Sequence, residues 1–318
     1  MVLCEISNLT NSPVTDFLIS WGVLTLLGGV SMAVLSGSIF YYYYCNVSYD
    51  TWTRKLNPEF PTPQKVRLEI RQMLKSLLAA TLVPALTLIL SQEKYKHLGL
   101  AKAYCGYAPA EGVEVPWGLS AGAYLVAQFL VFWVVSDFFE WAYHQVGHRF
   151  SFTWAIHRHH HVFYNPSPFS VISDEWADQL VRTSPLLFIP MALPTNIDLL
   201  FAQFALLFYA YGVYLHWGYE TPLISAHNPI INGSYEHYYH HAFSGGSTPI
   251  FTGFFFKCWD QMVGTVATGE CVCTVCEIKR GKRSPEAWKK VVVPDYSVLL
   301  STAFWAERDE VEGGKKVE

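Results

Sequence analysis

Histidines are concentrated in one half of the sequence, at spacings that suit metal binding. The chain has 12 histidines, and eleven of them lie between His144 and His241. His144 and His148 are four residues apart, so on a helix both rings project from one face and can chelate an ion. Imidazole is a ligand for zinc, copper, iron and nickel. The sequence therefore predicts metal binding in this half of the chain.

Two further motifs share one spacing, in which a histidine is followed three and four residues later by a pair. Their members are His157, His160 and His161 in the first motif, and His237, His240 and His241 in the second. On a helix this spacing gathers three rings on one face. With His216 and the earlier pair they make nine candidate ligands, too many for one ion, so we predict two metals. His159 and His227 fall outside the spacing and are expected to be ordinary hydrogen-bonded side chains.

A carboxylate precedes the first histidine pair. Asp137 lies seven residues before His144, on the same helical stripe and at the edge of an apolar run, where an unpaired carboxylate is costly. A carboxylate that accepts the far imidazole N–H fixes the orientation and the tautomer of a metal ligand. We therefore expect Asp137 to serve catalysis by orienting a ligand histidine, a role that fits it better than direct ligation.

The cysteines give a weaker signal. The seven cysteines are scattered and odd in number, unlike a disulfide framework. Cys271, Cys273 and Cys276 are spaced as in some zinc sites, but a closed zinc site takes four ligands and the sequence shows no fourth nearby. We expect no metal at these three cysteines.

The segments that must position these residues have the composition of a membrane protein. The chain has 318 residues, of which 51% are hydrophobic and 15% charged, and its net charge is −4. A soluble domain carries about 25% charged residues, so the composition excludes disorder and disfavours a soluble enzyme. The negative net charge supplies no basic field for binding nucleic acid.

Several apolar runs are long enough to cross a bilayer as helices. They cover residues 17–42, 74–91, 117–136 and 186–214, and the last run is interrupted at 194–198, which predicts a helical hairpin. The sequence therefore predicts an all-α integral membrane protein with four to five transmembrane or hairpin helices. The histidine motifs would form a helical cap on its cytosolic face.

The distribution of basic residues predicts orientation and organisation. Residues 45–75 carry six lysines and arginines, against three lysines in 91–117, so the former loop is expected in the cytosol. This choice places the histidine motifs and the C-terminus in the cytosol as well. We predict a membrane-anchoring region with two spans at 1–116, a catalytic domain at 117–265, and a cytosolic extension with a charged tail at 266–318.

In this setting the histidine motifs resemble those of the fatty acid hydroxylase and sterol desaturase superfamily, whose pattern is H-x₃-H, H-x₂-H-H and a second H-x₂-H-H. All three occur here in order. Within the superfamily the chain most resembles the sterol 5-desaturases, or lathosterol oxidases. The likeness covers residues 117–265 and rests on the interval from Asp137 to His144, on Asn165-Pro-Ser-Pro-Phe169, on Ile231-Asn-Gly-Ser234, and on Trp259-Asp260 with Gly264-Thr265.

Three departures weaken the likeness to the sterol 5-desaturases. Gln145 stands where the family often has arginine, and residues 242–258 lack its tyrosine-rich segment. The segment His216-Trp-Gly-Tyr-Glu220 resembles instead the sterol 4-methyl oxidases and cholesterol 25-hydroxylase. The superfamily resemblance survives these departures, whereas the choice of substrate is left open.

The resemblance implies an endoplasmic reticulum enzyme with two non-haem iron ions and O₂ as co-substrate. It would desaturate or hydroxylate a lipid C–H bond with electrons relayed by cytochrome b5 and its NAD(P)H-dependent reductase, since the sequence has no dinucleotide fingerprint of its own. The expected substrate is a sterol; a fatty acyl, sphingoid or alkylglycerol lipid is the alternative. A metal transporter or a zinc-holding scaffold is a remote alternative. The final residues, 315–318, resemble a dilysine retrieval signal.

Overall fold

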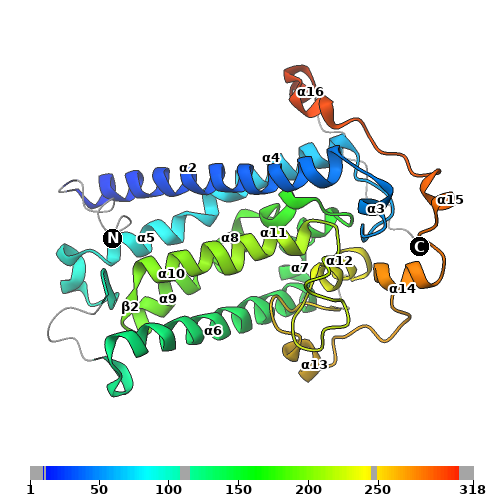
Figure 1. Cartoon of the computed structure of the whole chain (residues 1–318). Coiled ribbons are helices and arrows are strands. Elements are labelled where there is room, and N and C mark those ends of the chain that lie inside the picture. Colours follow the sequence, from blue (N-terminus) through cyan, green and yellow to red (C-terminus); the bar gives the residue numbers. More distant parts are fainter. Residues whose placement is uncertain (1–9, 11, 108–114, 245–248, 308–318) are drawn as a thin grey trace. The chain divides into compact units, whose positions relative to one another are not determined.

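The computed structural model describes residues 10, 12–107, 115–244 and 249–307. The α-helices of these residues are α2 (Pro13–Phe40), α3 (Tyr49–Trp52), α4 (Pro63–Ala80), α5 (Leu82–Leu90), α6 (Ala121–Arg149), α7 (Ser151–His157), α8 (Trp176–Arg182), α9 (Pro185–Ala192), α10 (Ile197–Gln203), α11 (Tyr211–His216), α12 (Ser234–Phe243), α13 (Cys258–Val263), α14 (Thr274–Lys279), α15 (Pro285–Trp288) and α16 (Thr302–Ala306) (Figure 1). Short 3₁₀- or π-helical segments are η1 (Tyr41–Cys45), η2 (Glu93–Leu98), η3 (Pro116–Gly118), η4 (His160–Val162), η5 (Pro168–Ile172), η6 (Phe204–Ala210) and η7 (Tyr296–Leu300).

Four stretches of helix are long and apolar enough to cross a membrane: Pro13–Cys45, Pro63–Leu90, Ala121–Arg149 and Ile197–His216. The prediction of an all-α protein with four to five such helices is thus confirmed. The predicted break in the last apolar run is also present, because α9 ends at Ala192 and α10 begins at Ile197. Among the described residues only the second arm of this hairpin is long enough to span.

Two of the helices extend well beyond the apolar runs that predicted them. The helix expected from residue 74 begins at Pro63, and the one expected to lose its apolar character at residue 136 continues to Arg149. Lysine, arginine, glutamate and glutamine have high helix propensity, so polar residues end an apolar run without ending a helix. The extension of α6 brings His144 and His148 onto one continuous helix, as their spacing predicted.

The internal contacts divide the chain into two compact units, which we describe separately. The first unit comprises Met1–Ser31, Lys75–Tyr143 and Trp176–Tyr211, and the second comprises Met32–Leu74, His144–Glu175 and Gly212–Glu318. The three functional regions predicted along the sequence, with boundaries at 117 and 266, stay a prediction.

The first unit is built around an apolar cluster of helices. Phe132 of α6 packs against Leu186 and Ile189 of α9 and against Leu200 and Phe204 of the α10–η6 segment. The described strands also belong to this unit: β1 (Ala103–Tyr104) pairs in parallel with β2 (Thr195–Asn196) at the hairpin break.

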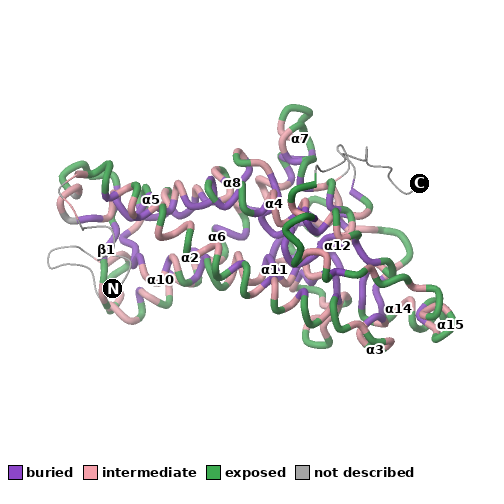
Figure 2. Tube along the Cα trace, turned by 90° about the horizontal axis from the view of Figure 1, so that it is seen from above, coloured by how far each residue is buried: buried purple, intermediate pink, exposed green. Residues whose placement is uncertain are grey.

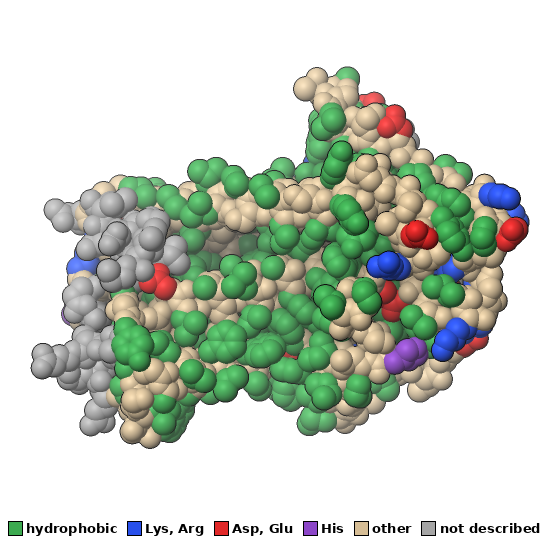
Figure 3. All heavy atoms as spheres, viewed as in Figure 1, with side chains coloured by type: hydrophobic (Ala, Val, Ile, Leu, Met, Phe, Trp, Pro, Cys, Tyr) green, Lys and Arg blue, Asp and Glu red, His purple; other side chains and the backbone are tan. Residues whose placement is uncertain are grey.

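Large apolar side chains remain exposed along the candidate spans. On α2 the exposed fractions are 66% for Leu26, 54% for Val30 and 63% for Val34. Hydrophobic side chains cover much of the visible face of the long helices in Figure 3. Soluble proteins rarely expose contiguous apolar surface of this kind, which suits helices surrounded by lipid.

One described cysteine forms a disulfide. Cys105 is disulfide-bonded, which is short of the disulfide framework that the sequence was expected to lack. Pairing requires two Cα atoms about 4.4 to 6.8 Å apart, a condition that spacing in the sequence does not reveal. Five other cysteines, Cys45, Cys258, Cys271, Cys273 and Cys276, are free.

Candidate metal centre

The structure brings all nine predicted histidine ligands together, in two groups. The first histidine group consists of His144, His148, His157, His161 and His240, and the second consists of His160, His216, His237 and His241. Within each group, one nitrogen from every ring lies within 4.8 Å of the others. Both groups lie in the second compact unit. The arrangement therefore offers two places for a metal ion.

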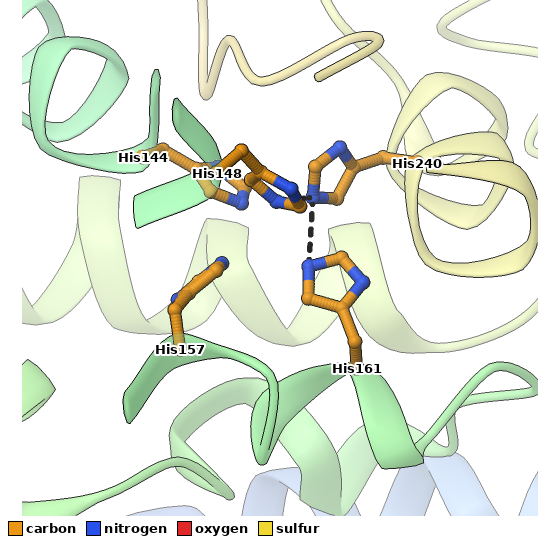
Figure 4. A group of neighbouring side chains, drawn as sticks. All are labelled: His144, His148, His157, His161 and His240. Carbon is orange, nitrogen blue, oxygen red and sulfur yellow. Dashed lines mark hydrogen bonds between the residues drawn. The ribbon is translucent and has the colours of Figure 1, made fainter. Parts of the chain in front are cut away.

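Four elements supply the first histidine group (Figure 4). His144 and His148 project from α6, one turn apart, while His157 ends α7 and His161 lies in η4. His240 comes from α12, most of which is buried (Figure 2). Elements far apart in the sequence thus converge on one place.

The spacing of each triple motif predicted three rings on one face of a helix. The structure shows a different arrangement. The helix carrying the first motif ends at His157, and His160 and His161 follow in the 3₁₀ turn η4, from which they enter different groups. In α12 the helix is continuous, but adjacent residues point about 100° apart, so His240 and His241 also enter different groups. Each H-H pair therefore supplies one ligand to each site.

The nitrogens of the first histidine group are spaced like the ligands of one ion. His240 Nε2 lies 3.2 Å from His148 Nε2 and 3.1 Å from His161 Nε2. Two nitrogens bound to zinc at 2.0–2.1 Å would be about 2.9 Å apart at a right angle and about 3.4 Å apart at a tetrahedral angle. The observed separations fall in that range, so these rings fit a shared metal without rearrangement.

Backbone carbonyls set the tautomers of this group. His144 Nδ1 lies 3.1 Å from the Thr252 carbonyl oxygen, and His240 Nδ1 lies 2.7 Å from that of Ile250. A carbonyl only accepts, so Nδ1 carries the proton and Nε2 of the neutral ring keeps its lone pair. His144 Nε2 is buried and has no hydrogen-bond partner among the described residues. A buried lone pair of this kind is satisfied by a bound cation.

The second histidine group has the same construction. His216 Nδ1 lies 2.7 Å from the carbonyl oxygen of Gly212, one turn earlier in α11, so Nδ1 carries the proton and Nε2 of the neutral ring keeps its lone pair. That Nε2 lies 2.8 Å from His237 Nε2 and 3.3 Å from His160 Nε2. His241 Nε2 is 3.2 Å from His237 Nε2. The four rings again fit one ion.

The two histidine groups are adjacent. The rings of His161, in the first group, and His241, in the second, stack with centroids 5.0 Å apart. The rings of the neighbours His160 and His161 lie 5.9 Å apart. Two metals held this close can act on one bound molecule, as in enzymes with two-metal sites.

Three of these histidines are held in the uncharged form that binds metals. Burial, reinforced by neighbouring imidazoles, lowers the pKa of His161, His240 and His241 well below the ordinary histidine value. At neutral pH these rings are therefore neutral, and metal binding does not have to displace a proton from them.

We expect acid to weaken both the fold and metal binding. Below about pH 6.5 the unfolded chain binds more protons than the folded chain, because the folded pKa values are lowered, so the free energy of unfolding falls as pH falls. Metal content and thermal stability in detergent, measured from about pH 8 to pH 5, should be level at first and then decline below about pH 6.5. His159→Ala should show the same profile, and stability that increases toward pH 5 would contradict the expectation.

A polar network beside the first histidine group holds the Thr252 carbonyl in place. Asp260 Oδ1 accepts hydrogen bonds from the hydroxyls of Thr252 (2.9 Å) and Thr265 (2.6 Å), and Oδ2 accepts from the Gly253 N–H (2.7 Å). Gln145 Nε2 donates to the Thr252 hydroxyl at 2.6 Å. The role of Thr252 was not predicted, because a backbone carbonyl that accepts from a histidine leaves no signal in the sequence. The likeness to the W-D…G-T element did point to Asp260 and Thr265.

Removing one acceptor from this network should impair the centre without destroying it. In Asp260→Asn one oxygen becomes an NH₂ group, which cannot accept from the Gly253 N–H or from the two hydroxyls. Changes to groups that orient ligand histidines cost roughly 10- to 100-fold in metal affinity or activity. We expect a loss of that size in metal affinity, measured by titration in detergent. Asp50→Asn, at an exposed aspartate, is the control, and an unchanged affinity in Asp260→Asn would show that the network is not needed.

Three residues outside the nine ligands complete the comparison with the sequence. Asp137 is fully buried in α6, two turns before His144, and its orienting role stays a prediction. His159 lies outside both groups and contacts Glu175 Oε1 at 2.6 Å. His227 also lies outside them, and its Nε2 lies 3.5 Å from the Sγ atoms of Cys273 and Cys276.

Comparison with known proteins finds the superfamily that the histidine motifs resemble. Residues 129–265 match the fatty acid hydroxylase family. Over 155 residues the chain is 28% identical to very-long-chain aldehyde decarbonylase GL1-10 of Oryza sativa subsp. japonica, covering 48% of this chain and 51% of that protein. Over 178 residues it is 26% identical to lathosterol oxidase of Homo sapiens, covering 54% and 56%. Over 142 residues it is 28% identical to methylsterol monooxygenase 1-3 of Arabidopsis thaliana, covering 44% and 48%.

The aligned segments span about half the length of these curated relatives, and no solved structure matches the chain. The family match includes all nine histidines of the two groups together with Asp137 and Asp260. Residues 129–265 thus form a fatty acid hydroxylase family domain, and the two histidine groups are its candidate metal centre.

Proposed function

We propose that the chain is a membrane-bound non-haem di-iron oxidoreductase that hydroxylates or desaturates a C–H bond of a lipid. The observation that carries this proposal is the pair of adjacent groups of imidazoles within residues that match the fatty acid hydroxylase family. The first group has five rings, one more than a structural zinc site takes. Two iron ions bound there would supply the reduction of O₂ and the oxidising power to break an unactivated C–H bond.

The protein's own part in this reaction is positional and electrostatic. The carbonyls of Thr252, Ile250 and Gly212 fix the rings of three ligands, so that their Nε2 lone pairs face the ions. Burial excludes water from the ligands and keeps their rings neutral at physiological pH. The exposed apolar faces of the long helices suit a substrate that stays in the bilayer.

For the substrate class we propose a sterol, and for the reaction one resembling sterol 5-desaturation. Two of the three relatives are named for sterols, and the other is named for very-long-chain aldehydes. Gln145 and the His216–Glu220 segment depart from the sterol 5-desaturase pattern, which favours keeping a fatty acyl, sphingoid or alkylglycerol lipid as the alternative.

We further propose an endoplasmic reticulum location with the histidine groups and the C-terminus in the cytosol. The excess of basic residues in 45–75 supports this orientation. The disulfide at Cys105 supports it too, because this cysteine lies in the connection predicted to be lumenal and disulfides persist in oxidising compartments. Electrons would come from cytochrome b5 and its NAD(P)H-dependent reductase. Residues 315–318, which resemble a retrieval signal, lie outside the described residues.

Expression in a yeast strain that lacks its own sterol 5-desaturase tests the function. We expect restored ergosterol, measured by mass spectrometry of total sterols and fatty acids. An unchanged sterol profile with a new hydroxylated lipid would favour the alternative substrates. Purified protein that binds metal but consumes neither O₂ nor reductant would overturn the enzyme proposal and favour a transporter or a zinc-holding scaffold.

A further inference from the structure

His227 and three cysteines gather at a place distinct from both histidine groups. The ligand atoms of His227, Cys271, Cys273 and Cys276 all lie within 4.8 Å of one another. The cysteines come from the segment that leads into α14 and from its first turn, and His227 comes from the loop between α11 and α12. The fourth ligand that the sequence lacked near the cysteines is therefore supplied by a distant loop of the same unit.

The measured separations match tetrahedral zinc coordination. His227 Nε2 lies 3.5 Å from Cys273 Sγ and 3.5 Å from Cys276 Sγ. Zinc binds sulfur at about 2.3 Å and imidazole nitrogen at about 2.0–2.1 Å, and at a tetrahedral angle these lengths place S and N about 3.5 Å apart. Three sulfurs and one imidazole fill all four positions, which is typical of a closed structural site.

The backbone around the cysteines is held by contacts that need no metal. Arg280 donates to the Cys271 carbonyl at 2.6 Å and pairs with Glu270 at 2.7 Å. The Thr274 N–H donates to a carboxylate oxygen of Glu220 at 2.7 Å. Cys273 is fully buried in an apolar cluster that also contains Leu56, Tyr235 and Tyr238. The thiols are thus presented on a shaped loop rather than on a loose segment.

We propose that His227, Cys271, Cys273 and Cys276 bind one zinc ion. The ion fastens the segment 271–276 to the loop of His227. The neighbouring Ala226 carbonyl accepts from Lys257 Nζ at 3.0 Å, and the same ammonium pairs with Glu236 of α12 at 2.5 Å. The zinc site therefore reinforces the surroundings of the helix that carries His237, His240 and His241, and this role does not depend on the chemistry of the histidine groups.

A cobalt experiment on the full-length chain in detergent reads out the thiolate ligands alone. After metal depletion, Co²⁺ should give a thiolate-to-cobalt charge-transfer band in the near ultraviolet, and about one equivalent of Zn²⁺ bound at this site should remove it. Cobalt on the histidine groups gives no such band, because those groups contain no sulfur. Absence of the band in the wild-type chain would overturn the proposal.

Substitutions locate the ion. Cys271→Ser and Cys276→Ser should lose the band and lower zinc by about one equivalent per chain, measured by mass spectrometry of the metals. Cys45→Ser and Cys258→Ser, at exposed free cysteines, are the matched controls and should keep both. Full zinc in Cys276→Ser would overturn the assignment. His240→Ala should keep the thiolate band, so failure of the di-iron proposal and failure of the zinc proposal give different results.

A third measurement needs no substitution and so does not depend on a variant folding. Zinc should slow the alkylation of Cys276 in the wild-type chain, read by mass spectrometry of its peptides, and a chelator should restore the rate. Cys258 serves as the internal reference, because it is free and exposed and should react alike in both conditions. Equal alkylation of Cys276 with and without zinc would contradict the site.

Discussion

His148→Ala and His240→Ala should each abolish turnover of the lipid substrate. His240 Nε2 is within 3.2 Å of two other ring nitrogens of the first histidine group, and both residues are buried, so alanine leaves a dry gap where a ligand atom belongs. The loss should exceed the roughly 10- to 100-fold that follows from disturbing a residue that only orients a ligand. Turnover is measured by product analysis on membranes with equal amounts of each variant.

Two comparisons make this expectation specific. His159→Ala should retain normal turnover, since its ring contacts Glu175 and belongs to neither histidine group. Turnover of Asp137→Asn should lie between that of His159→Ala and that of the two ligand variants, with a reduction of about 10- to 100-fold, if this carboxylate orients a ligand as predicted. Near-normal turnover in His148→Ala or His240→Ala would remove the first histidine group from the catalytic centre.

The neighbours His160 and His161 should affect different metal ions. Both alanine variants are expected to be inactive, because the proposed O₂-activating centre would need both metals. The metal contents of the two single variants do not distinguish the two histidine groups, so double variants are needed. A double variant within the second group, His160→Ala with His241→Ala, should keep about one iron per chain, whereas His160→Ala with His161→Ala, which removes a ligand from each group, should keep less.

This comparison uses iron content of the purified chain together with its folding in detergent. Thermal unfolding and gel filtration check that each variant remains monodisperse, so that a lower iron content is not a sign of denaturation. The two double variants each lose two histidines, which makes them matched for lost side chains. Equal iron content in both would contradict the division of the ligands into two separate groups.

The histidine motifs and the composition were enough to predict the fold class and the family likeness of this protein. Long apolar runs and a charged fraction of 15% predicted an all-α chain with several membrane-spanning helices, and the described residues confirm a helical chain with four stretches long and apolar enough to span a membrane. The three histidine motifs predicted the fatty acid hydroxylase family, to which residues 129–265 match. These features are local: a run of apolar residues and a four-residue interval on one helix have their meaning within a single element.

The polar groups around the ligands could not be predicted from such local features of the sequence. The Thr252 carbonyl that faces His144 belongs to the backbone, and every residue has one. Asp260, Gln145 and Thr265 meet around it only after α6, α13 and the segments that flank α13 have come together. Their spacing along the chain has no periodicity that would predict such a meeting.

By itself the sequence determined the fold class, the nine candidate ligands and the family likeness of this chain, because each depends on residue type and short-range spacing. Only the tertiary structure decided how the ligands divide, since the end of α7 at His157 and the rotation of about 100° between His240 and His241 send neighbours to different sites. It also joined His227 to the cysteine cluster, which nothing along the chain predicted. A metal site is a set of atoms within a few ångströms, and the chain path that brings distant residues to that distance is a property of the packed fold.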